Sequence, residues 1–306
     1  MFSFGFDFMS AQRHGVTGPS AIDFDFLSGP LPAGVQFSRS SDAILYALNG
    51  DLTQVGVNVA RFTNDPETGQ GLLIEPSSVN ILPHAIATRN SWSRSGATVT
   101  DVSLNALGLF PGVSVISEGQ NWHRILDHAT LNMGQAYSVT IYYRAGTSGM
   151  AAVTLKDGGS GASSSVGGTA GALTLDSNAA GAVTDLAEVL LPDAQTYRMR
   201  FTYVPNFTGA FNIGFGPNSR TAGEDVILLG MQMEPAVSPS SFILSDGGST
   251  VRAADQIGLT GLTGLYDVSV TYGDDSTEVF SAQTVDQGYW PPLSKTTLKS
   301  MRLTPL

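Results

Sequence analysis

Three segments of this chain alternate apolar and polar residues with a period of two, and this pattern restricts the fold more than any other feature. The segments are 137–144, 197–203 and 211–215. Because successive side chains of a β-strand point to opposite faces, each segment predicts a strand with one apolar and one more polar face. Residues 226–233 form a near-continuous apolar run, which predicts an inner strand. No segment keeps a helical period for more than two turns, so the chain is predicted to be all-β, with the half-buried strands of an antiparallel β-sandwich.

Turn-forming residues predict how some of these strands are connected. Asn49-Gly50 is a strong hairpin signal, and it lies between the apolar stretches 44–48 and 52–55. A second hairpin is predicted from 265–272 and 277–282. Residues 157–172 consist largely of Gly, Ser and Ala, and because they offer little apolar surface to bury, they predict a long flexible loop.

The charge balance argues against nucleic acid as a direct partner. The net charge is −11, and Lys156, Lys295 and Lys299 are the only lysines, so no concentrated basic surface is expected. The chain has no cysteine, so its stability must come from core size, sheet closure or homo-oligomerisation rather than from disulfides. It also lacks an apolar stretch of bilayer length and a signal-peptide pattern, so neither membrane insertion nor Sec export is expected.

Sequence motifs give no support for catalysis. The nucleophile elbow G-x-S-x-G, the P-loop and the zinc motif H-E-x-x-H are all missing from the sequence. His123 and His128 are five residues apart, which places them on opposite faces of a strand and argues against a metal pair. Asp274, Asp275 and Glu278 cluster in a predicted turn and could offer oxygen ligands to calcium, but they lack the spacing of an EF-hand loop. No catalytic residue and no cofactor is therefore expected, and structural calcium is the only metal considered.

A binding role has more support, and it centres on Trp122. Sugars stack their apolar C–H faces on aromatic rings while nearby polar side chains bond their hydroxyl groups, and Trp122 has polar neighbours on both sides. Whether Trp122 is exposed or lies in the core stays open, whereas Trp92 is expected in the core. The candidate carbohydrate-binding residues are Asn121, Trp122, His123, Arg124, Tyr142 and Arg144.

Two aromatic segments are candidates for subunit docking. Near the N-terminus, aromatic residues alternate with smaller ones, so a strand there would carry four aromatic rings on one face. Such a strand would either pack into its own domain or dock on another subunit. Tyr289-Trp290 precedes two prolines, so this pair enters an extended segment and would anchor either the C-terminal tail or an interface. The candidate docking residues are Phe2, Phe4, Phe6, Phe8, Tyr289 and Trp290.

Residues 58–82 join a turn cluster to a short apolar strand. Asn64–Gly69 contains Pro66, whose φ is fixed, and Gly69, which accepts a positive φ, so this cluster predicts a tight turn. The run Leu72-Leu73-Ile74 that follows is too short for a helix and predicts a strand that is buried on both faces.

Three blocks of short motifs lie along the chain, and the first of them includes most of this segment. The first block comprises Phe37-Ser38-Arg39-Ser40-Ser41, Asn49-Gly50, Asn58-Val59-Ala60-Arg61-Phe62, Asp65–Gly69 and Gly71-Leu72-Leu73-Ile74-Glu75-Pro76. The second is Asn80-Ile81-Leu82 followed by Trp92. The third comprises Gly230-Met231-Gln232-Met233-Glu234, Ser240-Ser241-Phe242-Ile243 and Thr250-Val251-Arg252-Ala253-Ala254-Asp255. In their order and spacing, these blocks resemble parts of phage and prophage spike and tail-fibre proteins. The chain departs from that pattern at 242–244, where many relatives have a Tyr-Ile or a Pro-Thr-rich turn.

The resemblance implies an N-terminal mounting module at 1–82, a jelly-roll-like, carbohydrate-binding sandwich at 83–248 and a small C-terminal β module at 249–306. It also implies a non-enzymatic virion protein of a phage or gene transfer agent, assembled in the bacterial cytoplasm as a homo-oligomer. Its expected partners are other virion proteins of the capsid, tail or fibre, together with host surface or capsular polysaccharide. One alternative is a purely architectural adaptor that joins a fibre to the capsid or tail. A capsule depolymerase is a third hypothesis, although such enzymes usually need a longer chain with a β-helix repeat.

Overall fold

In the computed structural model, which describes residues 20–27 and 29–306, β-strands are the only regular secondary structure. All paired strands of this part run antiparallel, so the predicted all-β class is confirmed. The three alternating segments are found as strands β12 (Tyr137–Arg144), β17 (Tyr197–Pro205) and β18 (Gly209–Gly216). Among the described residues there is no helix long and apolar enough to span a membrane.

Two six-stranded sheets pack face to face and form what we call the sandwich lobe. The junction sheet contains, in spatial order, β16 (Gly181–Leu190), β17, β12, β19 (Asp225–Glu234), β10 (Val113–Ser117) and β9 (Ala97–Asp101). The outer sheet contains β15 (Ala172–Asn178), β14 (Ser163–Thr169), β13 (Met150–Asp157), β18, β11 (Arg124–Leu131) and β8 (Ser93–Ser95). The chain crosses between the sheets from β11 to β12 to β13 and again from β17 to β18 to β19, which is a jelly-roll-like arrangement.

The sandwich core is made by the apolar faces that the alternation predicts. Val139 and Ile141 of β12 are fully buried against Val153 of β13 and against Ile213 and Phe215 of β18. Trp92 also belongs to this core, as predicted. The polar face of β12 is buried as well, because other parts of the chain cover the junction sheet from outside.

The prediction of a flexible loop at 157–172 is wrong. Within this range Ser163–Thr169 forms β14, an inner strand paired with β13 on one side and β15 on the other. Val166 supplies the only large apolar contact of β14 to the core. Gly167 leaves room for the Asp176 side chain, since a Cβ there would lie 2.7 Å from Asp176 Oδ2. The small residues therefore serve close packing in a sheet that its neighbouring strands hold in place.

The two ends of the described chain meet in one six-stranded terminal sheet. The strands of the terminal sheet are β1 (Ile22–Asp25), β5 (Arg61–Asp65), β6 (Gly69–Leu73), β22 (Gly264–Tyr272), β23 (Thr277–Val285) and β24 (Thr297–Pro305). β24 pairs with β1 and β6 from the N-terminal part and with β22 from the C-terminal part. The segments 1–82 and 249–306 were predicted as separate modules, but their described parts share a sheet and a core, and we call this unit of described residues the terminal lobe.

Three two-stranded ladders complete the fold. They pair β2 (Val35–Ser38) with β21 (Gln256–Leu259), β7 (Ser78–Asn80) with β20 (Thr250–Arg252), and β3 (Ala43–Tyr46) with β4 (Leu52–Val55). The β3–β4 hairpin confirms the Asn49-Gly50 prediction, with Gly50 at a φ of 87°. The β22–β23 hairpin was also predicted, and so was the tight turn that ends at Gly69.

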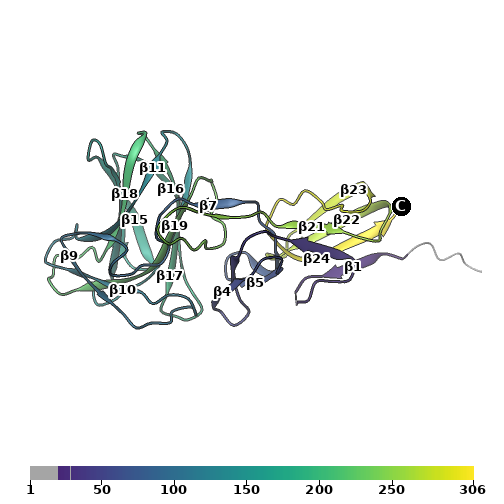
Figure 1. Ribbon diagram of the computed structural model, residues 1–306, viewed down its shortest axis with the longest axis horizontal. Coiled ribbons are helices and arrows are strands. Elements are labelled where there is room, and N and C mark those ends of the chain that lie inside the picture. Colours follow the sequence, from purple (N-terminus) through teal and green to yellow (C-terminus); the bar gives the residue numbers. More distant parts are fainter. Residues whose placement is uncertain (1–19, 28) are drawn as a thin grey trace, which may run out of the picture.

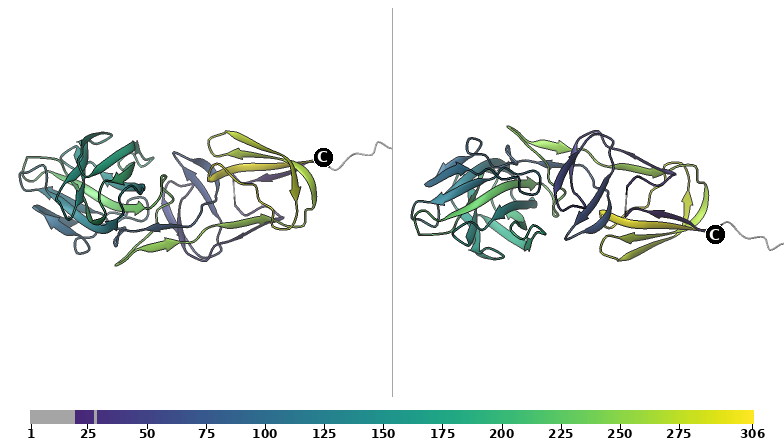
Figure 2. Two further views of the ribbon diagram at one scale, coloured as in Figure 1. Left: turned by 90° about the horizontal axis from the view of Figure 1, so that it is seen from above. Right: turned by 90° about the horizontal axis from the view of Figure 1, so that it is seen from below.

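The two lobes are arranged end to end (Figures 1 and 2). Between them, the β3–β4 hairpin packs on the outer face of the junction sheet and forms a third apolar cluster, the junction cluster. This cluster joins Ile44 and Tyr46 of the hairpin to Tyr142 of β12 and Leu229 of β19. The sandwich has two outward faces, one on each sheet. The hairpin covers the outward face of the junction sheet, so the outward face of the outer sheet is directed away from the terminal lobe.

Candidate functional site

Trp122 is exposed at the surface of the sandwich lobe. It lies in the loop that connects β10 to β11, and 55% of its surface is accessible to solvent. Its ring meets the ring of His123 edge to face, with centroids 4.6 Å apart. Gly96 makes room for this pair, since a Cβ at that position would lie 2.4 Å from the His123 ring. The question left open by the sequence is therefore settled in favour of an exposed ring.

The residues that follow Trp122 hold the loop from beneath. His123 is buried, and its Nδ1 accepts a hydrogen bond of 2.9 Å from the backbone N–H of Glu118. Arg124 is also buried and donates from Nη1 to the carbonyl oxygens of Asn121 and His123, at 2.7 and 3.2 Å. These contacts fix the backbone on both sides of Trp122, so the ring is presented by an ordered loop. This ordering lowers the entropy cost of binding through the ring.

Tyr142 and Arg144 do not join this group, because both belong to the junction sheet. Tyr142 is 3% exposed, and its ring packs against Phe110 and Phe242 in the junction cluster. Arg144 forms an ion pair with Asp193 at 3.1 Å. Tyr142 is therefore inaccessible to a polysaccharide in this fold, and the six candidate residues reduce to one cluster of four, 121–124.

The aromatic pair near the C-terminus packs within its own lobe. Tyr289 and Trp290 are half-buried against the terminal core, and Trp290 meets Phe26 edge to face at 6.1 Å. This packing anchors the segment after β23. The other predicted docking residues, Phe2, Phe4, Phe6 and Phe8, lie outside the described residues.

The carboxylates considered as calcium ligands are engaged with other side chains. Asp274 pairs with Lys295 at 2.5 Å, Asp275 pairs with Lys299, and Glu278 accepts a hydrogen bond from the Tyr272 hydroxyl. Across 20–27 and 29–306, no group of three or more His, Cys, Asp or Glu side chains is placed to hold a metal ion. The turn cluster is thus accounted for by local pairing.

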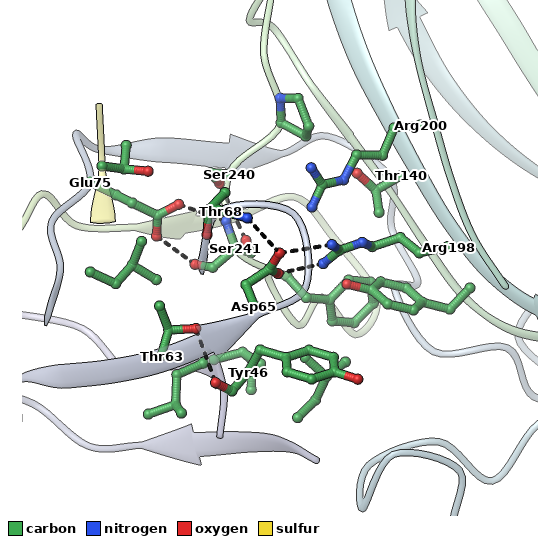
Figure 3. A pocket seen from close by; sticks show the side chains of 18 residues that line it. Tyr46, Thr63, Asp65, Thr68, Glu75, Thr140, Arg198, Arg200, Ser240 and Ser241 are labelled. Carbon is green, nitrogen blue, oxygen red and sulfur yellow. Dashed lines mark hydrogen bonds and ion pairs between the residues drawn. The ribbon is translucent and has the colours of Figure 1, made fainter. Parts of the chain in front are cut away.

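A second polar site, which the sequence did not predict, lies between the lobes (Figure 3). Arg198 of β17 reaches from the sandwich into the terminal lobe and binds both carboxylate oxygens of Asp65, at 2.5 and 2.8 Å. It also pairs with Glu67, which lies 3.2 Å from Arg200. The adjoining cavity of about 60 Å³ has room for about two water molecules, so it is too small for a sugar. We interpret this site as a structural joint between the lobes.

The joint continues into a buried ionic network that is built from the motif residues of the resemblance. Asp255 accepts hydrogen bonds from Arg39 at 3.1 Å, from Arg61 at 2.5 Å and from the backbone N–H of Glu75 at 2.8 Å. Glu75 in turn pairs with Arg61 at 2.7 Å and with Arg252 at 3.6 Å. The first and third sequence blocks therefore converge in space. Arg61, Glu75 and Arg252 each stand in a short, mostly apolar stretch of the sequence. A charged residue in such a stretch is expected to be buried with a partner of opposite charge, and this signal could have revealed the network.

The electrostatics of the joint predict a loss of stability in acid. Burial alone would raise the pKa of Asp65, but hydrogen bonds and positive charge from Arg198 outweigh it and lower the pKa to about 2. Since the folded state holds the carboxylate form, the contribution of Asp65 is complete above its ordinary pKa near 4 and is lost as the pH falls towards 2. We expect this loss to be about 2 kcal/mol in the free energy of unfolding, measured by urea titration at several pH values.

A matched variant isolates this contribution. Asp65→Asn cannot titrate, so its free energy of unfolding should change less between pH 4 and pH 2 than that of the unmodified chain. An equal pH dependence in both proteins would show that the Asp65–Arg198 contact contributes nothing to acid sensitivity.

Comparison with known proteins identifies no family for the chain. No protein-family model matches it, and no curated protein matches it either.

Proposed function

We propose that this protein is a structural component of a phage-like particle, a head spike or a fibre, whose sandwich lobe adheres to host surface or capsular polysaccharide. The observation that carries the proposal is Trp122, a ring that is 55% exposed on a loop held by buried polar residues. Large exposed rings with polar neighbours are typical of sugar-binding surfaces. The motif resemblance supplies the virion context.

The arrangement of the lobes supports this role. The terminal lobe packs on the junction sheet, so the opposite face of the sandwich is left for a partner. The ionic joint couples the two lobes across Arg198 and Asp65, so force on the sandwich would be transmitted to the terminal lobe. In this proposal the protein works as a homo-oligomer bound to other virion proteins, without direct nucleic-acid contact or membrane insertion. Several copies would add avidity to a weak single site.

Replacing Trp122 by alanine tests the proposal. We expect polysaccharide binding by the assembled protein to fall about tenfold or more, because a large stacking surface is removed. Glycan-array or pull-down binding to bacterial surface polysaccharides measures this. Folding should be preserved, since the ring is largely exposed.

Met133→Ala is the matched control. Met133 is a similarly exposed large side chain, with 63% of its surface accessible, but it lies at the other end of β11. Trp122 lies just before this strand and Met133 just after it, so the two side chains are separated by the length of the strand. Binding should therefore be unchanged in this variant. Equal loss in both variants, or no binding by the unmodified assembly, would contradict adhesion through Trp122.

An architectural adaptor without glycan binding is the second candidate. The observation in its favour is that the motif residues Arg39, Arg61 and Asp255 are buried in ion pairs that hold the N-terminal and C-terminal segments of the terminal lobe together, rather than lying on an open surface. This hypothesis predicts that Trp122→Ala particles attach to hosts normally. Both candidates treat the protein as non-enzymatic, so release of reducing ends from host capsule by the purified protein would overturn both.

A further inference from the structure

The outer sheet carries a buried arginine that lacks an acidic partner. Five arginines in the described part of the chain are at least nine-tenths buried, and four of them, Arg39, Arg61, Arg198 and Arg252, lie within ion-pair distance of a carboxylate. The fifth is Arg124, which is 7% exposed and forms no ion pair with a described residue. Burial lowers its pKa to about 10, and the charge of Asp176 offsets this only in part. A buried charge without a counter-charge is costly, so an anion at this point would be favoured.

The hydrogen bonds of Arg124 leave one nitrogen for a ligand. Its Nε donates to Thr154 Oγ1 at 2.9 Å, and its Nη1 donates to two backbone carbonyls. Nη2 has no hydrogen-bond partner among the described residues and is not fully buried. A single accessible nitrogen edge with two N–H groups, on a side chain that is otherwise buried, suits one oxygen of a carboxylate, whereas phosphate is usually held by the full guanidinium fork or by several donors.

Beneath the side chain of Arg124, the outer sheet has a floor of small, buried residues. Gly216, Ala152 and Gly167 lie side by side on β18, β13 and β14. A Cβ on Gly216 would lie 3.3 Å from Arg124 Nη1, and one on Gly167 would lie 2.7 Å from Asp176 Oδ2 and 3.1 Å from Asn218 Nδ2. The two glycines are two strand spacings apart, about 10 Å, so Arg124 stands over one end of the floor and Asp176 and Asn218 over the other.

The same face has another cation that forms no ion pair within 20–27 and 29–306. Lys156 is exposed and points to the same side of β13 as Thr154, whereas Lys295 and Lys299 are paired with carboxylates on the terminal lobe. The net charge of −11 makes most of the surface unfavourable for anions. The outer face of the outer sheet therefore offers two cations, Arg124 and Lys156, to an anionic polymer.

We propose that the polysaccharide bound by this face is acidic, with a sugar carboxylate held by Arg124 Nη2 next to the ring of Trp122. The inference rests on the proposed adhesive function and names its ligand class. Asn218 is placed to bond sugar hydroxyl groups, and Asp176 opposes the anion from the far end of the floor.

An array of bacterial capsular polysaccharides, each printed beside its carboxyl-reduced form, tests the inference with the full-length protein. We expect the bound glycans to be acidic and binding to fall about tenfold or more after carboxyl reduction. Arg124→Gln should remove the difference between the two forms. Asp176→Asn should strengthen binding to the acidic form, because it removes a repulsive charge from an exposed position, and this variant remains informative if Arg124→Gln fails to fold.

The possible failures are distinguishable. Binding that depends on Trp122 but is equal for the acidic and reduced forms would overturn the acidic subsite and leave adhesion intact. Weaker or unchanged binding by Asp176→Asn would also count against the subsite. If the unmodified protein binds no glycan, the proposed function fails, and the subsite fails with it.

Discussion

Asp255→Asn is expected to lower the free energy of unfolding by about 3–5 kcal/mol, because it removes one partner from a fully buried ionic network. Asp255 neutralises Arg39 at 3.1 Å and Arg61 at 2.5 Å, and the side chains of all three are inaccessible to solvent. After the substitution, Glu75 would still pair with Arg61 and Arg252, but Arg39 would lose the carboxylate with which it pairs. Urea unfolding followed by tryptophan fluorescence reports on both lobes, since Trp92 lies in the sandwich core and Trp290 packs on the terminal core.

Asp274→Asn is the control for this prediction. It removes an ion pair with Lys295 in which both side chains are 46% exposed, so solvent screens the interaction. We expect its unfolding curve to match that of the unmodified protein. If Asp255→Asn were equally silent, the network would be dispensable for folding, and its charged residues would need another explanation.

Arg198→Gln is expected to cost about 3 kcal/mol and to loosen the lobes relative to each other. Arg198 is 2% exposed and is the sandwich residue that binds Asp65 at 2.5 Å across the junction. Without it, Asp65 and Glu67 would retain only Arg200 as a cation nearby. Urea unfolding measures the stability, and small-angle X-ray scattering measures whether the end-to-end arrangement of the lobes persists.

Arg144→Gln is the matched variant on the same sheet. Its ion pair with Asp193 stays within the sandwich lobe and is partly exposed. We therefore expect Arg144→Gln to lower the free energy of unfolding only slightly and to leave the scattering profile unchanged. An unchanged scattering profile for Arg198→Gln as well would mean that the junction cluster around Tyr142 and Phe242 alone fixes the lobes.

Local chemistry was sufficient to predict several elements. The Asn49-Gly50 hairpin and the strands β12, β17 and β18 follow from turn preferences and from a period of two, which act between near neighbours. The prediction for 157–172 was wrong. Its small residues indicate flexibility when only near neighbours are considered, but β13 and β15 supply hydrogen bonds on both sides and make Ser163–Thr169 a strand. Tyr142 illustrates the same limit, because its strand alternation is correct but a distant hairpin covers its polar face.

The sequence by itself determined the all-β class and the main sandwich strands, and it singled out residues 121–124 as candidates for binding. Only the tertiary structure decided that Trp122 is exposed, that Arg124 forms no ion pair with a described residue and that the two ends of the described chain share one sheet. The difference has a physical reason. Strand periodicity and turns depend on residues a few positions apart, whereas burial and ion pairing depend on residues such as Arg39 and Asp255, which are 216 positions apart in the chain.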